Sequence, residues 1–173
     1  MEPRDLESEL ARVHPEGFAW AVRCCFGDRS EAEDVLHLAY VKVLDGRARF
    51  EGRSSFKTWL FGVIRRTALE QGRRRGLERF ALGRWWREHG SDEARETVTD
   101  HIAADEDGAS LRAALRRLSR RQQEILHLVF YQDLTIEEAA EVSGITVGTA
   151  RTHYERGKAR LRRLLASRGP SND

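Results

Sequence analysis

Residues 134–163, LTIEEAAEVSGITVGTARTHYERGKARLRR, decide how the C-terminal part of this chain folds. The stretch predicts a short helix, a turn at Gly144 and a second, basic helix. The chain must reverse direction at Gly144, which favours a residue that tolerates positive φ, and Thr146 is placed to cap the second helix. We expect the first helix to turn four apolar residues inward, Ile136, Ala139, Ala140 and Val142. The exposed side of the second should carry Arg151, Thr152, His153, Arg156 and Lys158.

This arrangement is typical of a helix-turn-helix, whose second helix enters the major groove of DNA. Nucleic acid is therefore the first partner to consider. The pattern alone does not say what the protein does on DNA.

The composition indicates an all-α fold. Only 3 of the 173 residues are proline and 8 % are aromatic, while 34 % are charged, so each core must be modest and mostly aliphatic. We expect two small helical domains joined by a flexible acidic linker with little structure of its own. The expected bounds are 1–80 for the first domain, 81–108 for the linker, 109–168 for the helix-turn-helix domain and 169–173 for a tail.

The charges are segregated along the chain, although the net charge is only +2. Residues 47–87 hold 12 basic and 3 acidic residues, and residues 110–168 hold 12 basic and 6 acidic. In contrast, residues 1–46 hold 5 basic and 10 acidic residues, and residues 91–108 hold 1 basic and 7 acidic. Two basic blocks separated by an acidic stretch suggest two contacts with a polyanion.

The sequence predicts a cytoplasmic protein without metal or cofactor. It contains no apolar run long enough to span a bilayer and no visible signal peptide. The only cysteines, Cys24 and Cys25, are adjacent, and adjacent residues rarely form a disulfide, so we expect reduced thiols. A metal site that uses both thiols and His14 is conceivable, but the spacing matches no zinc pattern, and burial of small side chains is the favoured interpretation.

The N-terminal half should contain four helices. We expect a short helix over residues 4–13, stopped by Pro15, and a second from Glu16 to Phe26. Ser30 and Glu33 form a potential capping box for a third helix that ends at about Leu44. The fourth helix should open at Ser55, carry apolar residues at helical spacing, and fade at Gly72. Its apolar residues are Phe56, Trp59, Leu60, Val63, Ile64 and Ala68.

The third of these helices carries two stripes. One is apolar and should face the core: Val35, Leu36, Ala39, Tyr40, Val43 and Leu44. The other mixes acidic and apolar residues: Asp34, His37, Leu38, Val41 and Asp45. This second stripe suggests either a docking surface for another protein or a helix buried on two sides of a small bundle, and the sequence leaves both interpretations open.

The stretch from Arg47 to Trp59 interleaves cations with aromatic rings, which suits single-stranded nucleic acid. Cations follow the phosphates while rings or apolar pockets take up unstacked bases. The alternative is a solvated basic face with Phe56 and Trp59 in the core. For strand binding the candidates are Phe50, Arg53, Ser54, Ser55, Lys57, Thr58 and Trp59. Further along, Arg65, Arg66 and Arg73–Arg75 are candidates for duplex phosphates.

Residues 76–109 lack a sustained period. Their first part holds Phe80, Leu82, Trp85 and Trp86 and could form a short helix or a clamped peptide. The double tryptophan could dock on another protein or extend the first core, and the second is slightly favoured. A second helical unit should begin near Ala109.

Taken together, these segments resemble bacterial sigma factors. Residues 32–35 (AEDV), 50–61 (FEGRSSFKTWLF) and 73–75 (RRR) resemble region 2. Residues 111–165, including LSRRQ at 118–122 and the helix-turn-helix, resemble region 4. The size, the two regions and the short linker without a region 3 domain are similar to those of the extracytoplasmic-function (ECF) group.

The resemblance implies a function and partners. In that group, region 2 docks on the clamp helices of the RNA polymerase β′ subunit and captures a flipped base of the −10 element, whereas region 4 reads the −35 element as duplex and contacts the β flap. An anti-sigma factor is a probable regulatory partner. For docking, the resemblance assigns Asp34, His37, Leu38, Val41 and Asp45. For the −10 element it assigns Phe50, Arg53, Ser54, Ser55, Lys57, Thr58, Trp59, Arg65 and Arg66. For the −35 element it assigns Thr146, Val147, Thr149, Arg151, Thr152, His153, Arg156 and Lys158.

The chain departs from the group's pattern at two places. His37 and Leu38 stand where Gln-Glu is common, and Arg66 stands where an Asn is common. The second departure predicts an unusual preference near the −10 element.

Two other functions are alternatives to a sigma factor. A stand-alone regulator that binds duplex DNA would need the helix-turn-helix but not residues 30–75. An enzyme is disfavoured because the six histidines are scattered and no nucleophile–base pair, phosphate loop or metal-ligand spacing is present.

Overall fold

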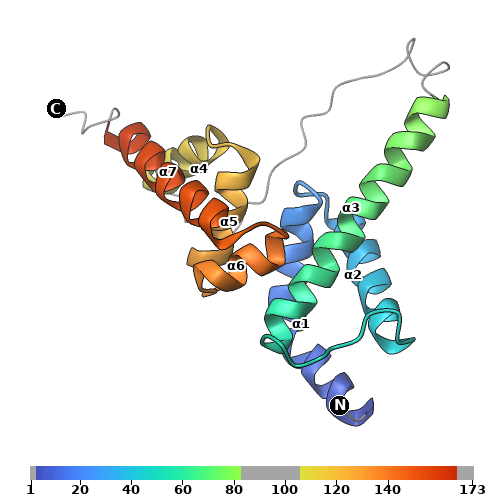
Figure 1. The fold of residues 1–173 in the computed structure, drawn as a ribbon. Helices are drawn as coiled ribbons and strands as arrows, with labels where there is room; N and C mark the ends of the chain where they lie inside the picture. The colour runs from blue at the N-terminus through green and yellow to red at the C-terminus, as the bar shows by residue number, and fades with distance from the viewer. Residues whose placement is uncertain (1–2, 83–105, 167–173) are drawn as a thin grey trace. The chain divides into compact units, whose positions relative to one another are not determined.

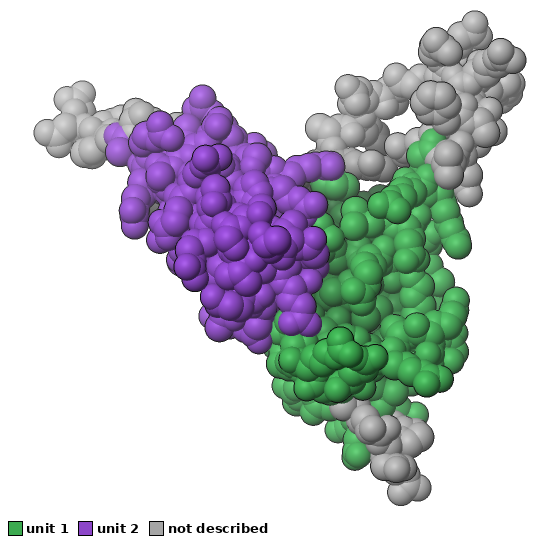
Figure 2. Space-filling view, in the orientation of Figure 1, with its two compact units in different colours: residues 1–98 green, residues 99–173 purple. Residues whose placement is uncertain are grey.

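The computed structural model describes residues 3–82 and 106–166, and these residues form helices without strands (Figure 1). The chain divides into two compact units, residues 1–98 and 99–173 (Figure 2). The all-α class predicted from composition is therefore confirmed. Trp85, Trp86 and most of the acidic segment lie outside the described residues. No helix in the described part of the chain is long and apolar enough to cross a membrane.

Unit 1 is a three-helix bundle of α1 (Pro3–Cys24), α2 (Arg29–Leu44) and α3 (Phe56–Leu82). Each helix packs against the other two. Trp20 of α1 is 1 % exposed, stacks on Phe61 of α3 with ring centroids 5.8 Å apart, and donates from Nε1 to the Phe61 carbonyl at 3.0 Å. This contact anchors α1 to the N-terminal half of α3.

The prediction that Pro15 separates two helices is wrong, because α1 continues through it. Proline inside a helix removes a backbone hydrogen bond and costs about 3 kcal/mol. Burial on both sides of Pro15 offsets this cost, because Val13 is 1 % exposed and Gly17 is buried.

The start of α2 also differs from the prediction, whereas its end agrees. The cap is Asp28, whose carboxylate accepts from the Glu31 backbone N–H at 2.9 Å, and the expected box of Ser30 and Glu33 is not formed. The helix ends at Leu44 as expected. Leu44 itself is 57 % exposed, so its placement in the core stripe was wrong.

The long helix α3 opens as predicted but does not fade at Gly72. Ser55 caps it by accepting from the Thr58 N–H at 3.1 Å, and the helix then runs to Leu82, with its C-terminal part projecting beyond α1 and α2 (Figure 1). Arg75 pairs across to α2, at 2.9 Å from Glu31 and 3.8 Å from Asp34. This contact offsets the cost of glycine in a helix interior, roughly 1 kcal/mol.

Neither Cys24 nor Cys25 forms a disulfide, and Cys25 is buried. Burial raises the pKa of the Cys25 thiol to about 12, with the Glu31 and Asp28 carboxylates adding to the shift. His14 lies 3.1 Å from the Tyr40 hydroxyl instead of joining the thiols. Among the described residues, no group of three His, Cys, Asp or Glu side chains could hold a metal ion.

Unit 2 contains α4 (Glu106–Arg116), α5 (Arg120–Phe130), α6 (Ile136–Ser143) and α7 (Val147–Ala166). The last two form the predicted helix-turn-helix. Gly144 has φ of +64°, and Thr146 caps α7 by accepting from the Thr149 N–H at 3.2 Å. Both predictions are confirmed. The core consists of Ala114, Leu118, Ile125, Leu126, Leu128, Leu134, Ala139, Ala140, Val142 and Ala150; Ile136 is only half-buried.

Candidate nucleic-acid interface

The outer surface of α7 is the first candidate interface, and its residues fall on separate stripes. A residue advances about 100° around an α-helix, so positions three and four apart share a face. The packing stripe consists of Ala150, Tyr154, Gly157, Leu161 and Leu164, all buried or half-buried. A second stripe is fully exposed and consists of Thr149, Thr152, Arg156, Arg160 and Arg163. A third carries Arg151, Glu155, Lys158 and Arg162.

The residues predicted to contact the −35 element are therefore divided between two sides of α7. Thr149, Thr152 and Arg156 share the second stripe, with the half-buried His153 beside it. Arg151 and Lys158 lie on the third stripe, about 120° away by the helical repeat.

Two of the three cations of the third stripe, Arg151 and Lys158, lie beside carboxylates. Arg151 lies 3.5 Å from Glu137 of α6, and Lys158 lies 3.3 Å from Glu155 and 4.3 Å from the Tyr154 ring centroid. The Arg151–Glu137 pair leaves both side chains at least 60 % exposed. Exposed pairs are typically worth about 0–1 kcal/mol, so a phosphate or base edge can displace Glu137 at small cost.

Close packing sets the position of α7 on α5. A Cβ placed on Gly157 would come within 3.0 Å of Leu126 Cδ1 and 3.3 Å of Gln122 Cβ. Only glycine permits this approach without a shift of α5. Sequence patterns did not predict this contact, because an isolated glycine in a helix interior normally weakens the helix.

The loop before α3, residues 45–55, is the second candidate interface. Three aromatic rings pack together and anchor it, and we call it the ring-anchored loop. Phe50 lies 5.5 Å from Phe56 and 5.3 Å from Trp59, and the last two rings are 5.3 Å apart. Phe56 is buried at 7 % exposure, whereas Phe50 and Trp59 are half-buried. Phe56 is therefore part of the core of unit 1, whereas the rings of Phe50 and Trp59 are partly accessible to solvent.

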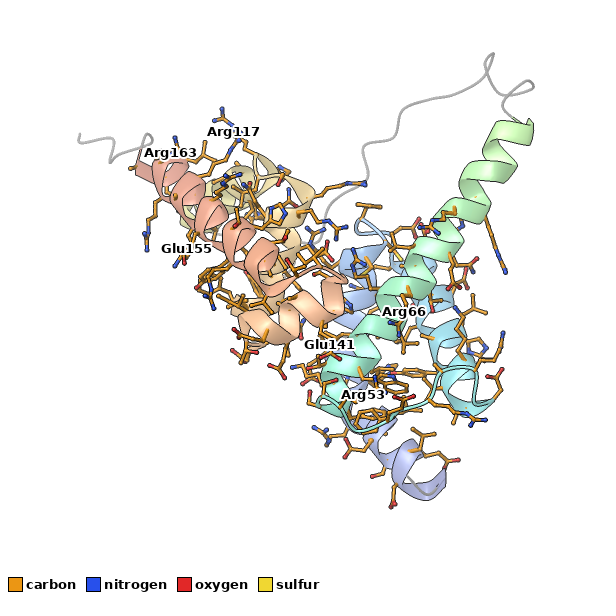
Figure 3. The ribbon with its side chains drawn as sticks, in the orientation of Figure 1. Arg53, Arg66, Arg117, Glu141, Glu155 and Arg163 are labelled. Carbon is orange, nitrogen blue, oxygen red and sulfur yellow. The ribbon has the colours of Figure 1, made fainter. Side chains whose placement is uncertain are left out.

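The loop presents Arg53 to solvent. Its side chain is 85 % exposed and pairs only at the surface, with Glu51 at 2.9 Å. Gly52 has φ of +72°, a backbone conformation that suits glycine and turns the chain back towards α3. Ser54 is half-buried and Ser55 exposed. Figure 3 shows Arg53 on this loop and Arg66 farther along α3.

The structure corrects the assignment of Thr58 to base recognition. Its side chain is 0 % exposed, and its hydroxyl lies 2.8 Å from that of Ser55. A base edge cannot reach it. Thr58 instead holds the Ser55 side chain at the start of α3, which positions the loop.

The cations of α3 differ in how exposed they are and in whether a carboxylate already holds them. Lys57 is 24 % exposed, lies 3.8 Å from Glu16 of α1 and sits over the Phe61 ring. Arg65 is half-buried and Arg66 is exposed. Within the arginine run, Arg75 is held by Glu31 as described above, so the run does not act as a uniform cationic surface.

The acidic and apolar stripe of α2 faces outward. Asp34, His37 and Asp45 are exposed, and Leu38 and Val41 are half-buried. The opposite side of the helix carries its buried residues, Ala32, Val35, Leu36, Ala39 and Val43. Arg47 hydrogen bonds to Asp45 at 2.6 Å, which lowers the pKa of that carboxyl. The stripe is thus available to a partner rather than buried on two sides.

Comparison with known proteins agrees with these two units. Residues 10–78 match the family model for Sigma-70 region 2, and residues 108–161 match that for Sigma-70, region 4. The ECF RNA polymerase sigma factor SigX of Bacillus subtilis is 28 % identical over 80 % of this chain and 72 % of its own length. The ECF RNA polymerase sigma factor EcfG of Rhodopseudomonas palustris is 29 % identical over 92 % of this chain and 84 % of its own.

A solved structure extends the comparison to the fold. The sigma factor RpoE of Bartonella quintana, crystallised with the anti-sigma factor NepR, superposes with a TM-score of 0.70 at 27 % identity. The match covers 94 % of this chain and 98 % of that one. The two matched regions together take in most of the chain, and the chain belongs to the sigma-70 family as a sigma factor of the extracytoplasmic-function group.

Proposed function

We propose that this sigma factor, which directs RNA polymerase core enzyme to promoters, divides recognition between its two units. Unit 2 would bind the −35 element as duplex through α7, and unit 1 would capture the −10 strand at the loop before α3. The presence of both candidate interfaces in one chain carries the proposal. A stand-alone regulator would not need the ring-anchored loop of unit 1, and this disfavours the alternative.

The −35 contact would use the exposed N-terminal turns of α7. A recognition helix reads base edges from its first turns, where Val147 is 39 % exposed and Thr149 and Thr152 are exposed. Arg151 would exchange Glu137 for a base or phosphate. The remaining proposed contacts are Thr146, His153, Arg156 and Lys158.

Replacement of Arg151 tests the readout. If Arg151 contacts a base edge, Arg151→Ala should reduce discrimination between the preferred −35 sequence and a single mismatch by about 1–3 kcal/mol. Competition binding of holoenzyme to matched and mismatched duplexes measures the difference. A loss of equal size on every sequence would show that Arg151 contacts a phosphate instead.

Glu137→Gln is the matched control. It frees Arg151 from its ion pair without removing the guanidinium, so discrimination should be retained. If Glu137→Gln lost as much discrimination as Arg151→Ala, the Glu137–Arg151 ion pair would act by positioning α7, and Arg151 would not contact DNA.

The −10 contact would place single-stranded DNA across the ring-anchored loop. Arg53 is almost fully exposed, Ser54 and Ser55 offer hydroxyls, and Phe50 and Trp59 present ring edges. A flipped base needs such a combination of stacking surface and polar edge. Lys57, Arg65 and Arg66 would contact neighbouring phosphates, and Thr58 would position Ser55.

Charge removal from the loop should slow promoter melting more than it weakens duplex binding. For Arg53→Gln combined with Lys57→Gln, we expect closed-complex affinity to change little while open-complex formation falls by about tenfold or more, since hydrogen bonds to charged groups are worth about 1.5–3 kcal/mol each. Permanganate footprinting and duplex binding at low temperature report the two steps separately. Arg12→Gln with Arg29→Gln removes the same charge from α1 and α2, outside the loop, and serves as the control. Equal loss in both steps would contradict strand capture.

The outward stripe of α2 is the proposed docking surface for the β′ clamp helices, with the β flap engaged by unit 2. Asp34, His37, Leu38, Val41 and Asp45 combine carboxylates with half-exposed apolar groups, which is the composition of a protein interface rim and core. The solved relative was crystallised with an anti-sigma factor, and we extend such a partner to this chain.

We further propose that the protein acts in the cytoplasm, associated with the nucleoid through RNA polymerase, and that it has no catalytic activity of its own. Run-off transcription with purified core polymerase, on genomic fragments that include the upstream region of its own gene, tests the function. Transcripts that depend on the protein and start at discrete positions are the expected result. Duplex binding by the protein alone, without such transcripts, would favour the stand-alone regulator.

A further inference from the structure

The exposed stripe on α7 continues well beyond the turns that read base edges. Thr149, Thr152, Arg156, Arg160 and Arg163 follow one another at spacings of three, four, four and three residues. Each is exposed, and the row extends to the C-terminal end of the helix, where Figure 3 shows Arg163. Its last two members were not among the residues singled out from the sequence.

The charge on this stripe differs from that on its neighbour. The stripe carries three arginines and no carboxylate, whereas the stripe of Arg151 and Lys158 includes Glu155 and is largely neutralised by ion pairs. Among the described residues, Arg156, Arg160 and Arg163 have no ion pair; Arg163 donates only to the Ala159 carbonyl of its own helix, at 3.4 Å. Like charges this close repel one another unless a polyanion is bound.

The dimensions of the helix suggest what that polyanion is. Arg160 stands thirteen residues after Val147, which is about 20 Å along an α-helix at 1.5 Å per residue. The major groove is about 12 Å wide. A helix that inserts its first turns into the groove therefore extends beyond the groove edge. Residues this far along the helix lie near the phosphates that border the groove, within reach of a long arginine side chain.

We propose that Arg160 and Arg163 bind backbone phosphates beside the −35 element and so extend the DNA contact of α7 beyond its base-reading turns. This inference rests on the proposed −35 function of unit 2. The two arginines supply affinity and hold the helix in register, while sequence discrimination stays with the turns around Thr149 and Thr152. Phosphate contacts fix orientation without reading sequence.

The salt dependence of binding tests this inference. Full-length Arg160→Gln/Arg163→Gln protein, assembled with core polymerase, is titrated against a promoter duplex identified by run-off transcription, in the cold and at several KCl concentrations. Each phosphate contact contributes about 0.9 to the slope of log K against log salt. The expected slope is therefore shallower by about 2, and the ratio of wild-type to variant affinity shrinks roughly tenfold between 50 and 200 mM salt.

Arg162→Gln is the control, because it removes one exposed charge from the adjacent stripe, between the two test positions, and its effect is compared with half of the change in the double variant. We expect its slope to equal that of the wild type and the discrimination against a mismatched −35 element to be unchanged in both variants. If Arg162→Gln lowered the salt slope by about half as much as the double variant, the loss of any positive charge on α7 would explain the result, and the inference would be overturned. A double variant that lowers transcription with an unaltered salt slope would do the same and would point to an acidic protein partner. If wild-type holoenzyme itself does not prefer the promoter duplex, the proposed −35 function fails instead.

Discussion

Trp20→Ala is expected to reduce the free energy of unfolding of unit 1 by about 3–5 kcal/mol, the range for truncation of large buried aromatics. Trp20 is 1 % exposed and joins α1 to α3 through both a ring stack and a hydrogen bond to the Phe61 carbonyl. Because domains are stable by only about 5–15 kcal/mol, this loss removes a large fraction of the stability of unit 1. Urea denaturation followed by circular dichroism measures the change, and hydrogen exchange locates it in α1–α3.

Trp20→Phe separates the two contributions. Phenylalanine keeps a ring to stack on Phe61 but loses the indole N–H, so the loss should be clearly smaller than for alanine. If alanine and phenylalanine cost the same, the hydrogen bond and not the packed ring would be the main stabilising contact. If neither lowers stability, the assignment of Trp20 as the anchor of the bundle is wrong.

Gly157→Val should destabilise unit 2 by about 1–3 kcal/mol, the usual cost of overpacking a close-fitting contact. Its first added carbon would already lie 3.0 Å from Leu126 and 3.3 Å from Gln122, so α7 must move away from α5. That movement also tilts the recognition helix, and we expect promoter affinity to fall with stability. Thermal denaturation and duplex binding by the holoenzyme measure the two effects.

Gly148→Val provides the contrast on the same helix. A Cβ at Gly148 meets nothing within 4 Å, and valine is a better helix former than glycine by a few tenths of a kcal/mol. Unfolding should therefore be unchanged or slightly harder. If both valine variants lose stability equally, branching in the helix is responsible and close packing at Gly157 is not.

Elements governed by neighbouring residues were predicted well. Gly144 supplies the left-handed turn, and Thr146 and Ser55 cap the helices that follow them. Each depends on a backbone conformation or a hydrogen bond within three or four residues, and the chemistry of those residues determines it. Helical periodicity placed the second α2 stripe opposite the core face, but only its exposure decided between the two interpretations that the sequence left open.

Apart from the Ser30–Glu33 box, which Asp28 replaces as the cap of α2, the errors lie where distant segments compete with local preference. Pro15 and Gly72 are unfavourable inside helices, yet α1 and α3 pass through them. Burial around Pro15 and the reach of Arg75 to Glu31 outweigh the local cost. Leu44 was assigned to the core from its periodicity, but at the last position of α2 it meets no partner helix and stays 57 % exposed.

The sequence by itself determined the helical class, the helix-turn-helix and the membership of the sigma-70 family, because these follow from local patterns and from motifs in a given order. Only the tertiary structure decided which cations are free. Arg151 and Arg75 look like other arginines in the sequence, but each lies beside a carboxylate of another helix, whereas Arg53 extends into solvent with only a surface pair and Arg160 and Arg163 have none among the described residues. The same holds for Thr58, which burial removes from the binding surface. Pairing and burial depend on side chains far apart in the chain, and their energies are comparable to the local preferences that sequence patterns express.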